Sequence, residues 1–499
     1  MSTKTAIKMW FVEPDILGQL LGLPLASRLF HLIKRCHASA RYAREFVKWR
    51  VLAPVWAALY RSAVNQLSRG SLVRGEMQTI RPTGQTRRIV YYIWSFPTLS
   101  ETFIQREVAA LIKAGVPVEV IAHEVEDREL LGHDARALME RTHYLSKIWW
   151  GRLARYAWGL FWRRPLAFIS VVLYIVGCRY DDRKCLAFDL AVFVRAAYLA
   201  EVLRAKGADH VHAPWASTDA FVALAAARLL KITYTVQARA YDIHRHTSAV
   251  GLPLKLANAG FVVTNSSYNE AILRSLLPSG AGGKVRKIYN GIDLGRFVPR
   301  ERASHPETGV KLLSVGDLVE PKGLEYLMQA CRSLKDRGYA IQCEIIGGKV
   351  AGEINYYIEL MKLQKSLGLQ DQVLFLGRQP FDRVLEKYQD ADIFVLPAVT
   401  AKHGGRDITP NALIEAMAMK LAVVSTTSGA IPEIVENGVS GILLPPRDAD
   451  ALAQAIVGLI ENESLRKQFG NYARKRVEER FDISKNVANF VDLFSRGLY

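Results

Sequence analysis

The chain has 499 residues, 50% of them hydrophobic, which is enough for two domains of ordinary size and an extension. Its formal net charge is +18 at pH 7, and the excess is local: residues 1–88 hold 15 Lys and Arg against 4 Asp and Glu, and residues 141–200 hold 10 against 3. The five cysteines lack metal-ligand or paired spacing, which indicates free thiols in a reducing compartment and excludes a disulfide-built secreted domain.

Both basic segments also carry many aromatic and aliphatic side chains, as in the run KIWWGRLARYAWGLFWRRPLAF over residues 147–168. This interleaving at helical spacing favours an anionic membrane surface over nucleic acid as the partner. A pair of core-packing helices with a solvated basic face is the alternative. The longest apolar run, residues 165–177, is shorter than the roughly 20 residues that span a bilayer, and no secretory signal is visible. We therefore expect a cytoplasmic protein, peripheral on the inner face of the cytoplasmic membrane.

The order of strand and helix patterns predicts an α/β fold. Residues 1–86 predict a basic amphipathic helical extension without assignable chemistry. A strand, a helix and a strand are then expected at residues 87–94, 103–116 and 117–123. Such a unit opens a Rossmann-like domain, which we place at residues 87–298 with an insertion of basic aromatic helices at about 147–205.

A second alternating region predicts another domain of the same kind at residues 299–480. Its linker begins near the turn at Asn290 and Gly291. Strands are expected at residues 341–348, 373–377, 391–398 and 422–426. The final residues, 481–499, predict a helix that crosses back to the first domain.

Residues 407–436 contain two strand-to-helix turns in succession. In the first, Thr409 is the expected N-cap of the helix and Pro410 its first position. Helix N-termini at the carboxyl edge of a parallel sheet bind anions such as a diphosphate. Asp407 and Glu415, eight residues apart, add carboxylates that accept hydrogen bonds from hydroxyls. Together these features predict a nucleotide-sugar site.

These residues resemble the signature of the retaining glycosyltransferases of family 4, which is E-x7-E, then A-M-A, a strand and G-x-P-E. Here the signature runs as D-x7-E from Asp407 to Glu415, followed by AMA at 416–418 and GAIPE at 429–433. The run from Ser95 to Phe103 is similar to the first loop of exopolysaccharide glycosyltransferases within that family. The resemblance implies the GT-B fold, two facing Rossmann-like domains with a cleft between them, and a metal-independent reaction that uses no cofactor.

The resemblance also implies the roles of individual residues. Asp407 is expected to hold sugar hydroxyls and Glu415 ribose hydroxyls, and with Arg239 they form the catalytic set. Lys322 is the expected diphosphate ligand. The other donor-binding residues are Gly316, Gly348, Arg378, Pro410, Asn411, Ser428, Gly429, Ala430 and Ile431. The acceptor-binding residues are Ser100, Glu101 and His212, although simple helix capping explains Ser100 and Glu101 about as well.

At two charged positions the sequence departs from the family pattern. Asp317 stands where the family commonly has a phosphate-binding arginine, and Arg378 or Arg406 is a candidate compensator. Arg239 stands where the family usually has a histidine near the reacting sugar. An arginine binds phosphate or sugar oxygens but does not exchange a proton at neutral pH.

The sequence contains short patterns that resemble metal-binding motifs, but each has a simpler structural explanation. His210 and His212 alternate on an expected strand, while His244 and His246 lie in a loop without supporting carboxylates. The two D-x-D matches begin a buried strand and cap a helix. We therefore expect no metal site.

The hypothesis favoured by the sequence is a hexosyltransferase that takes a nucleotide sugar as donor and a lipid-linked saccharide as acceptor, in exopolysaccharide or surface-glycan assembly. A phospholipid or a soluble sugar as acceptor is one alternative. A non-catalytic nucleotide-sugar-binding scaffold is the other, and the departures at Asp317 and Arg239 motivate it.

Overall fold

The computed structural model describes residues 87–98, 101–126, 131–145, 150–177, 183–239, 242–243, 251–300, 309–402, 404–405 and 408–496. The predicted N-terminal extension lies outside these residues. So do three predicted site residues, Ser100, Arg406 and Asp407.

The first domain is built on a parallel sheet of seven strands in the order β3-β2-β1-β4-β5-β6-β7. These strands are β1 Ile89–Tyr92, β2 Val118–Ala122, β3 Thr142–Tyr144, β4 His210–Ala213, β5 Thr233–Gln237, β6 Val262–Thr264 and β7 Val285–Lys287. β1 is central, because Ile89 pairs in register with Val118 of β2 on one side and with His210 of β4 on the other. All four β1 residues are buried, as the continuous apolar run IVYY predicts.

The second domain repeats this plan with six parallel strands in the order β10-β9-β8-β11-β12-β13. They are β8 Val310–Val315, β9 Ile341–Ile346, β10 Val373–Gly377, β11 Ile393–Leu396, β12 Ala422–Thr426 and β13 Ile442–Leu444. In each sheet the strand order reverses once, between β1 and β4 and between β8 and β11. Ligands of open parallel sheets bind at the carboxyl ends of the strands at such a reversal. The predicted fold class, two Rossmann-like domains, is confirmed.

Helices connect the strands and cover both sheets. In the first domain they are α6 Thr102–Lys113, α7 His133–Glu140, α10 Arg183–Lys206, α11 Thr218–Leu230, α13 Leu252–Ala257 and α14 Ser267–Ser275. In the second domain they are α15 Leu324–Asp336, α16 Ile354–Ser366, α17 Phe381–Asp390, α18 Asn411–Ala418, α19 Ile431–Ile434 and α20 Ala449–Glu461.

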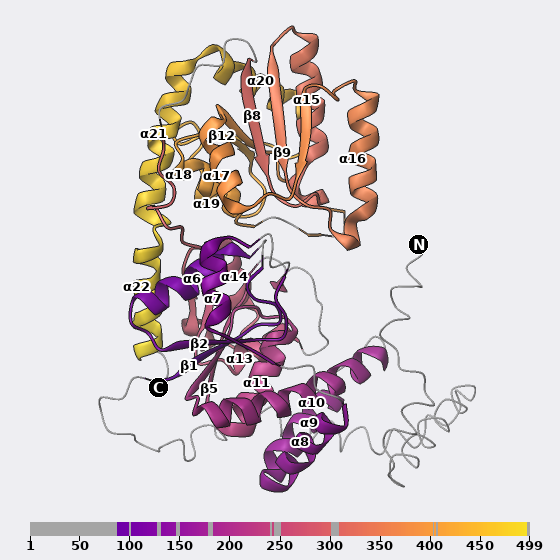
Figure 1. Ribbon diagram of the computed structural model, residues 1–499, viewed down its shortest axis with the longest axis vertical. Helices are drawn as coiled ribbons and strands as arrows, with labels where there is room; N and C mark the ends of the chain where they lie inside the picture. Colours follow the sequence, from indigo (N-terminus) through magenta and orange to yellow (C-terminus); the bar gives the residue numbers. More distant parts are fainter. Residues whose placement is uncertain are drawn as a thin grey trace, which may run out of the picture. The chain divides into compact units, whose positions relative to one another are not determined.

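Two C-terminal helices run from the second domain back to the first. α21 (Glu463–Arg480) packs against α18 and β12, and α22 (Ile483–Arg496) packs against α6 (Figure 1). Phe490 and Phe494 of α22 are part of the buried core of the first domain, where Phe494 contacts the ring of Tyr91. The last helix therefore completes a core that the first half of the chain begins.

The predicted basic aromatic insertion is helical, and its helices divide between two compact units. α8 (Trp150–Arg163) and α9 (Pro165–Gly177) belong to one unit, whereas α10 belongs to the unit that holds both sheets and packs against α11. Among the described residues, no helix has both the length and the apolar character needed to cross a bilayer.

Candidate functional site

The two strand-to-helix turns predicted around residues 407–436 lie side by side in the second domain. β11 and β12 pair in parallel, with Leu396 opposite Ser425, so both carboxyl ends meet at one edge of the sheet. α18 follows β11, and the four-residue α19 follows β12. The local sequence produces this arrangement because buried apolar strands end in polar turns that contain Pro410 and Gly429.

The start of α18 differs from the prediction in one detail. Pro410 is the N-cap residue and Asn411 the first helical residue, and no side chain caps the helix. The Thr409 hydroxyl oxygen instead accepts a hydrogen bond from Asn265 Nδ2 at 2.5 Å, and Asn411 Oδ1 accepts one from Asn290 Nδ2 at 2.9 Å. Thr409 was predicted as the cap, but side chains of the first domain contact both Thr409 and Asn411.

Glu415 lies on the buried side of α18, with 6% of its surface exposed. Its Oε1 is 2.5 Å from Nη2 of Arg106 on α6, and its Oε2 accepts a hydrogen bond from the Tyr388 hydroxyl at 3.1 Å. Arg106 also lies over the rings of Phe297 and Phe381. The carboxylate predicted to hold the ribose is therefore already paired with a cation of the first domain.

The backbone amides expected to bind the diphosphate are largely engaged within the turn. Ala430 N–H donates to Ile408 O, Ile431 N–H to Ser428 O, and Ser428 N–H more weakly to the Thr426 hydroxyl at 3.4 Å. The Ser428 hydroxyl is buried and has no hydrogen-bond partner among the described residues. Three of the four amides of residues 428–431 are thus engaged, so the predicted diphosphate contact would depend on the Gly429 amide and the Ser428 hydroxyl.

Two predicted glycines make room for cations. A Cβ atom on Gly316 would lie 2.7 Å from Cε of Lys322, and one on Gly348 would lie 2.1 Å from Nε of Arg378. The sequence-based reason for Gly348 was close approach of a nucleotide. The structure shows that both glycines also seat the side chains predicted to bind phosphate.

Arg378 is held by two carboxylates. Its Nη1 is 2.9 Å from Glu126 and its Nη2 is 3.3 Å from Asp317. Asp317, which replaces the expected phosphate-binding arginine, thus pairs with the cation proposed to compensate for it. The two carboxylates offset the charge of Arg378, so its attraction for a phosphate is weaker than the sequence suggested.

Glu101 lies between the first-domain loop and α6 and has an unusual proton affinity. The pKa of its carboxyl is raised to about 7, mainly by burial. A hydrogen bond from Trp215 and the charge of Arg239 lower the pKa, whereas the charges of Asp219 and Asp242 raise it. Its backbone N–H donates to the Thr98 hydroxyl at 3.2 Å. A carboxyl that titrates near neutral pH in a half-buried position can exchange a proton with a substrate hydroxyl.

The two other first-domain candidates belong to a buried polar network. His212 Nδ1 contacts the Thr235 hydroxyl at 2.7 Å, and its Nε2 contacts Gln237 Nε2 at 3.0 Å. Burial holds the pKa of His212 well below its usual value, and the neighbouring His210 and Arg239 lower it further. Both ring nitrogens are occupied, so His212 supports the sheet and leaves no nitrogen for an acceptor.

Arg239 is buried in the same network and pairs with Glu107 of α6 at 3.1 Å. Glu107 also accepts a hydrogen bond from the Tyr91 hydroxyl. Sequence reasoning missed Glu107, although a signal existed: it is a charge on the face of α6 that Ile104, Val108 and Leu111 bury. Arg239 Nε and Nη1 are buried and have no hydrogen-bond partner among the described residues, so part of the donor capacity of the guanidinium is unused.

Glu433, the last residue of the signature, joins the two domains. Its carboxylate accepts hydrogen bonds from the backbone N–H groups of Ser267 and Tyr268 at 2.8 and 2.9 Å and from the Tyr289 hydroxyl at 3.1 Å. Burial acts to raise its pKa, but these hydrogen bonds outweigh burial and lower it. Glu433 therefore fixes the start of α14 as an anion at neutral pH.

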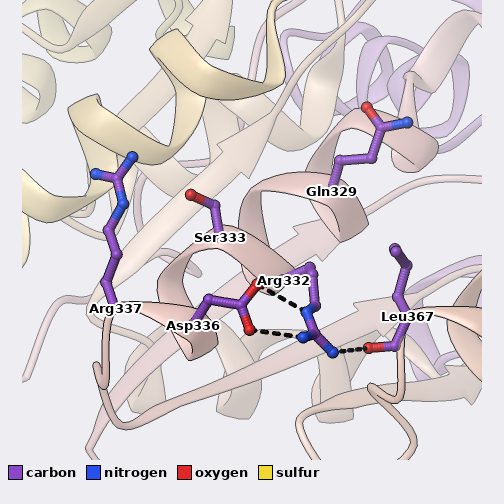
Figure 2. Close-up of a pocket in the computed structure, with 6 residues that line it drawn as sticks. All are labelled: Gln329, Arg332, Ser333, Asp336, Arg337 and Leu367. Carbon is purple, nitrogen blue, oxygen red and sulfur yellow. Dashed lines mark hydrogen bonds and ion pairs between the residues drawn. The ribbon is translucent and has the colours of Figure 1, made fainter.

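The described residues form no metal-ligand cluster, and a pocket among them holds none of the predicted site residues. Within the described ranges, no group of three or more His, Cys, Asp or Glu side chains is placed to hold a metal ion. A pocket of about 410 Å³ lies on α15 (Figure 2) and contains none of the predicted site residues. Its Arg332 is bound to Asp336 and to the Leu367 carbonyl.

Comparison with known proteins finds similarity to glycosyltransferases over part of the chain. Residues 298–476 match the family described as glycosyl transferases group 1. The chain is 36% identical over 214 residues to WcaL of Escherichia coli strain K12, named as a colanic acid biosynthesis glycosyltransferase, covering 42% of this chain and 51% of that protein. It is 35% identical over 200 residues to the amylovoran biosynthesis glycosyltransferase AmsK of Erwinia amylovora, covering 40% and 47%. These two matches span about half of each relative.

Longer matches support the whole architecture. WcaL of Salmonella typhimurium is 27% identical over 418 residues, covering 81% of this chain and 99% of that protein. Among solved structures, HepE of Anabaena in complex with UDP and glucose superposes with a TM-score of 0.61 at 18% identity, covering 82% of this chain and 99% of that one. At this identity the likeness shows the fold.

Proposed function

Because residues 298–476 match the family described as glycosyl transferases group 1, we propose that the chain is a glycosyltransferase of exopolysaccharide biosynthesis. It moves a hexose from a nucleotide sugar to a lipid-linked saccharide at the inner face of the cytoplasmic membrane. The single observation that supports the donor half is that β11 and β12 end at one edge of the sheet, where the helix with Glu415 and the turn with Ser428 and Gly429 follow them. The named roles of WcaL and AmsK support the exopolysaccharide assignment.

The donor is held by Glu415 at its ribose and by Lys322, Gly429 N–H and Ser428 at its diphosphate. The departing nucleoside diphosphate gains negative charge as the glycosidic bond breaks. A fixed lysine and preorganised N–H groups therefore stabilise the transition state more than the bound substrate. The sugar keeps its anomeric configuration, and a phosphate oxygen of the leaving group takes the acceptor proton, so no protein base is required for transfer.

In this proposal Glu101 and Arg239 bind the acceptor. Glu101 is half-buried with a pKa of about 7, and two nitrogens of Arg239 lack partners among the described residues. Both groups suit hydrogen bonds with sugar hydroxyls. His212 supports them from within the sheet.

A thermal-stability screen of the full-length chain against nucleotide sugars tests the donor site. A matching nucleotide sugar raises the melting temperature, and the rise grows with the logarithm of its concentration once this exceeds Kd. Lys322→Met weakens this binding about tenfold or more, since it removes a charged phosphate ligand. Lys362→Met, at an exposed position on α16, is the matched control. Equal binding by both variants would remove Lys322 from the site.

A non-catalytic nucleotide-sugar-binding scaffold is a second candidate, favoured by the pairing of Arg378 with Asp317 and Glu126. That pairing reduces the positive charge available to stabilise a leaving group. Calorimetry with nucleoside diphosphates followed by donor turnover distinguishes the two functions. Binding without turnover in the presence of membranes supports the scaffold.

A further inference from the structure

Helices α8 and α9 expose an unusual concentration of large apolar side chains. Trp158, Trp162, Leu166 and Ile169 are 62%, 66%, 83% and 41% exposed. They fall within twelve residues, and elsewhere in the described ranges such exposed side chains are scattered. Isolated exposed apolar residues are normal on protein surfaces, but a contiguous group marks an interaction surface.

The aromatic rings of this surface form one connected cluster. Phe161 contacts Trp158, Trp162 and Phe168 at ring-centroid distances of 6.0, 5.5 and 5.5 Å. Trp158 and Trp162 also contact each other at 5.7 Å. The cluster therefore bridges α8 and α9 and presents a single apolar face, which we call the tryptophan face.

The tryptophan face is not the packing face of these helices. α8 buries Leu153, Ala157 and Leu160, which recur at helical spacing, and α9 buries Val171 and Ile175. Because each helix already has a buried side, the exposed rings do not serve the internal packing of the described residues. This observation disfavours the alternative in which the segment is only a pair of core-packing helices.

The charge around the tryptophan face has one sign. Residues 146–180 contain six Lys and Arg and no Asp or Glu. Arg152, Arg155 and Arg163 are exposed on α8, the helix that also carries Trp158 and Trp162. Arginine keeps its guanidinium in water while its methylene groups lie along an apolar surface, which suits the boundary between lipid headgroups and acyl chains.

We propose that the tryptophan face and its arginines bind an anionic lipid surface. Tryptophan favours the membrane interface, basic residues are attracted by anionic headgroups, and the aliphatic Leu166 and Ile169 insert among acyl chains without offering a ring for base stacking. Nucleic acid is therefore the weaker match. The tryptophan face adds to the proposed function the surface that contacts the membrane. Its role rests on the proposed function only in taking the acceptor to be lipid-linked.

Vesicle co-sedimentation of the full-length chain tests this proposal without any sugar-transfer assay. The vesicles contain either phosphatidylcholine with phosphatidylglycerol or phosphatidylcholine alone. The wild-type chain sediments with the anionic vesicles, and Trp158→Ala with Trp162→Ala weakens binding about tenfold. The matched control, Ile358→Ala with Tyr472→Ala, removes exposed apolar side chains from α16 and α21 and leaves binding unchanged.

Two further experiments separate the contribution of the arginine charges to vesicle binding from that of the tryptophan rings. Arg155→Gln with Arg163→Gln reduces binding to anionic vesicles, whereas Arg337→Gln with Lys475→Gln, at exposed positions elsewhere, does not. Brominated acyl chains quench tryptophan fluorescence of the wild-type chain and quench it less in the double tryptophan variant. All replaced side chains are exposed, so melting curves of the variants match the wild type.

Any of three results overturns the proposal. The first is unchanged sedimentation of the double tryptophan variant with anionic vesicles. The second is a change from dimer to monomer in that variant, which assigns the tryptophan face to a second copy of the chain. The third is tighter binding of the wild-type chain to duplex RNA than to anionic vesicles, with the same loss on removal of the tryptophans. Failure of sugar transfer leaves this measurement unaffected, so the two proposals fail separately.

Discussion

The guanidinium of Arg106 lies 2.5 Å from the carboxylate of Glu415, although 309 positions separate the two residues in the chain. Their side chains are 12% and 8% exposed. The pair joins α6 of the first domain to α18 of the second. A ribose that uses Glu415 must share this carboxylate with Arg106 or displace the guanidinium from it, so donor binding and the contact between the domains are linked.

Removing Arg106 is expected to destabilise the protein. Arg106→Gln leaves Glu415 buried with the Tyr388 hydroxyl as its remaining partner, and an unpaired buried charge of this kind costs about 3–5 kcal/mol. Chemical denaturation measures the change. Arg296→Gln is the control, because Arg296 forms an exposed pair with Asp134, which is worth within about 1 kcal/mol. Equal losses in the free energy of unfolding for the two substitutions would contradict a stabilising role of the buried Arg106–Glu415 pair.

The carboxyl of Glu101 gives stability a defined pH dependence. Its pKa is raised from 4.5 to about 7 in the folded state, so the folded chain binds more protons than the unfolded chain between these values. Stability therefore falls as the pH rises through this window and levels off above about 7. Glu101→Gln removes this penalty and gains up to about 3 kcal/mol relative to the wild type by pH 8. Urea denaturation from pH 5 to pH 8 measures the difference, and a difference that does not change with pH argues against a raised pKa.

A methyl group on Gly347 is expected to disturb the strand edge that seats Arg378 and Lys322. A Cβ atom there would lie 1.8 Å from the Gly316 backbone oxygen, which cannot move without breaking the sheet edge. Gly347→Ala therefore costs about 2 kcal/mol or more. In Gly352→Ala the new Cβ meets no atom within 4 Å, so stability is unchanged or slightly improved. Thermal unfolding of both variants tests the contrast, and similar melting temperatures would count against the close approach.

The fold follows from local sequence to a large extent. The runs IVYY of β1, IFVL of β11 and AVVST of β12 are apolar throughout, and each is followed by a turn and a helix, which predicts buried parallel strands. The carboxyl-edge site follows from the same pattern, because parallel strands present their carboxyl ends on one side. For these elements short-range sequence and tertiary structure agree.

The partners of the site residues could not be predicted in the same way. Arg106 and Glu415 meet because two domains pack together, and nothing near Arg106 in the sequence marks it. The assignment of Thr409 as a cap was wrong because a side chain from the first domain, Asn265, takes its hydroxyl. His212 matched an acceptor residue by its place at a strand end, but Thr235 and Gln237 of the neighbouring strand occupy its nitrogens.

The most direct test of the account is the release of nucleoside diphosphate from nucleotide sugars by the full-length chain with bacterial membranes as acceptor source. Glu415→Gln preserves the shape of the side chain and its hydrogen bonds to Arg106 and Tyr388 while removing the charge. The account predicts sugar-dependent release by the wild type and a loss of about tenfold or more in the variant at low donor concentration, because hydrogen bonds from the ribose to a charged carboxylate are worth about 1.5–3 kcal/mol. Full release by Glu415→Gln would contradict the proposed donor site.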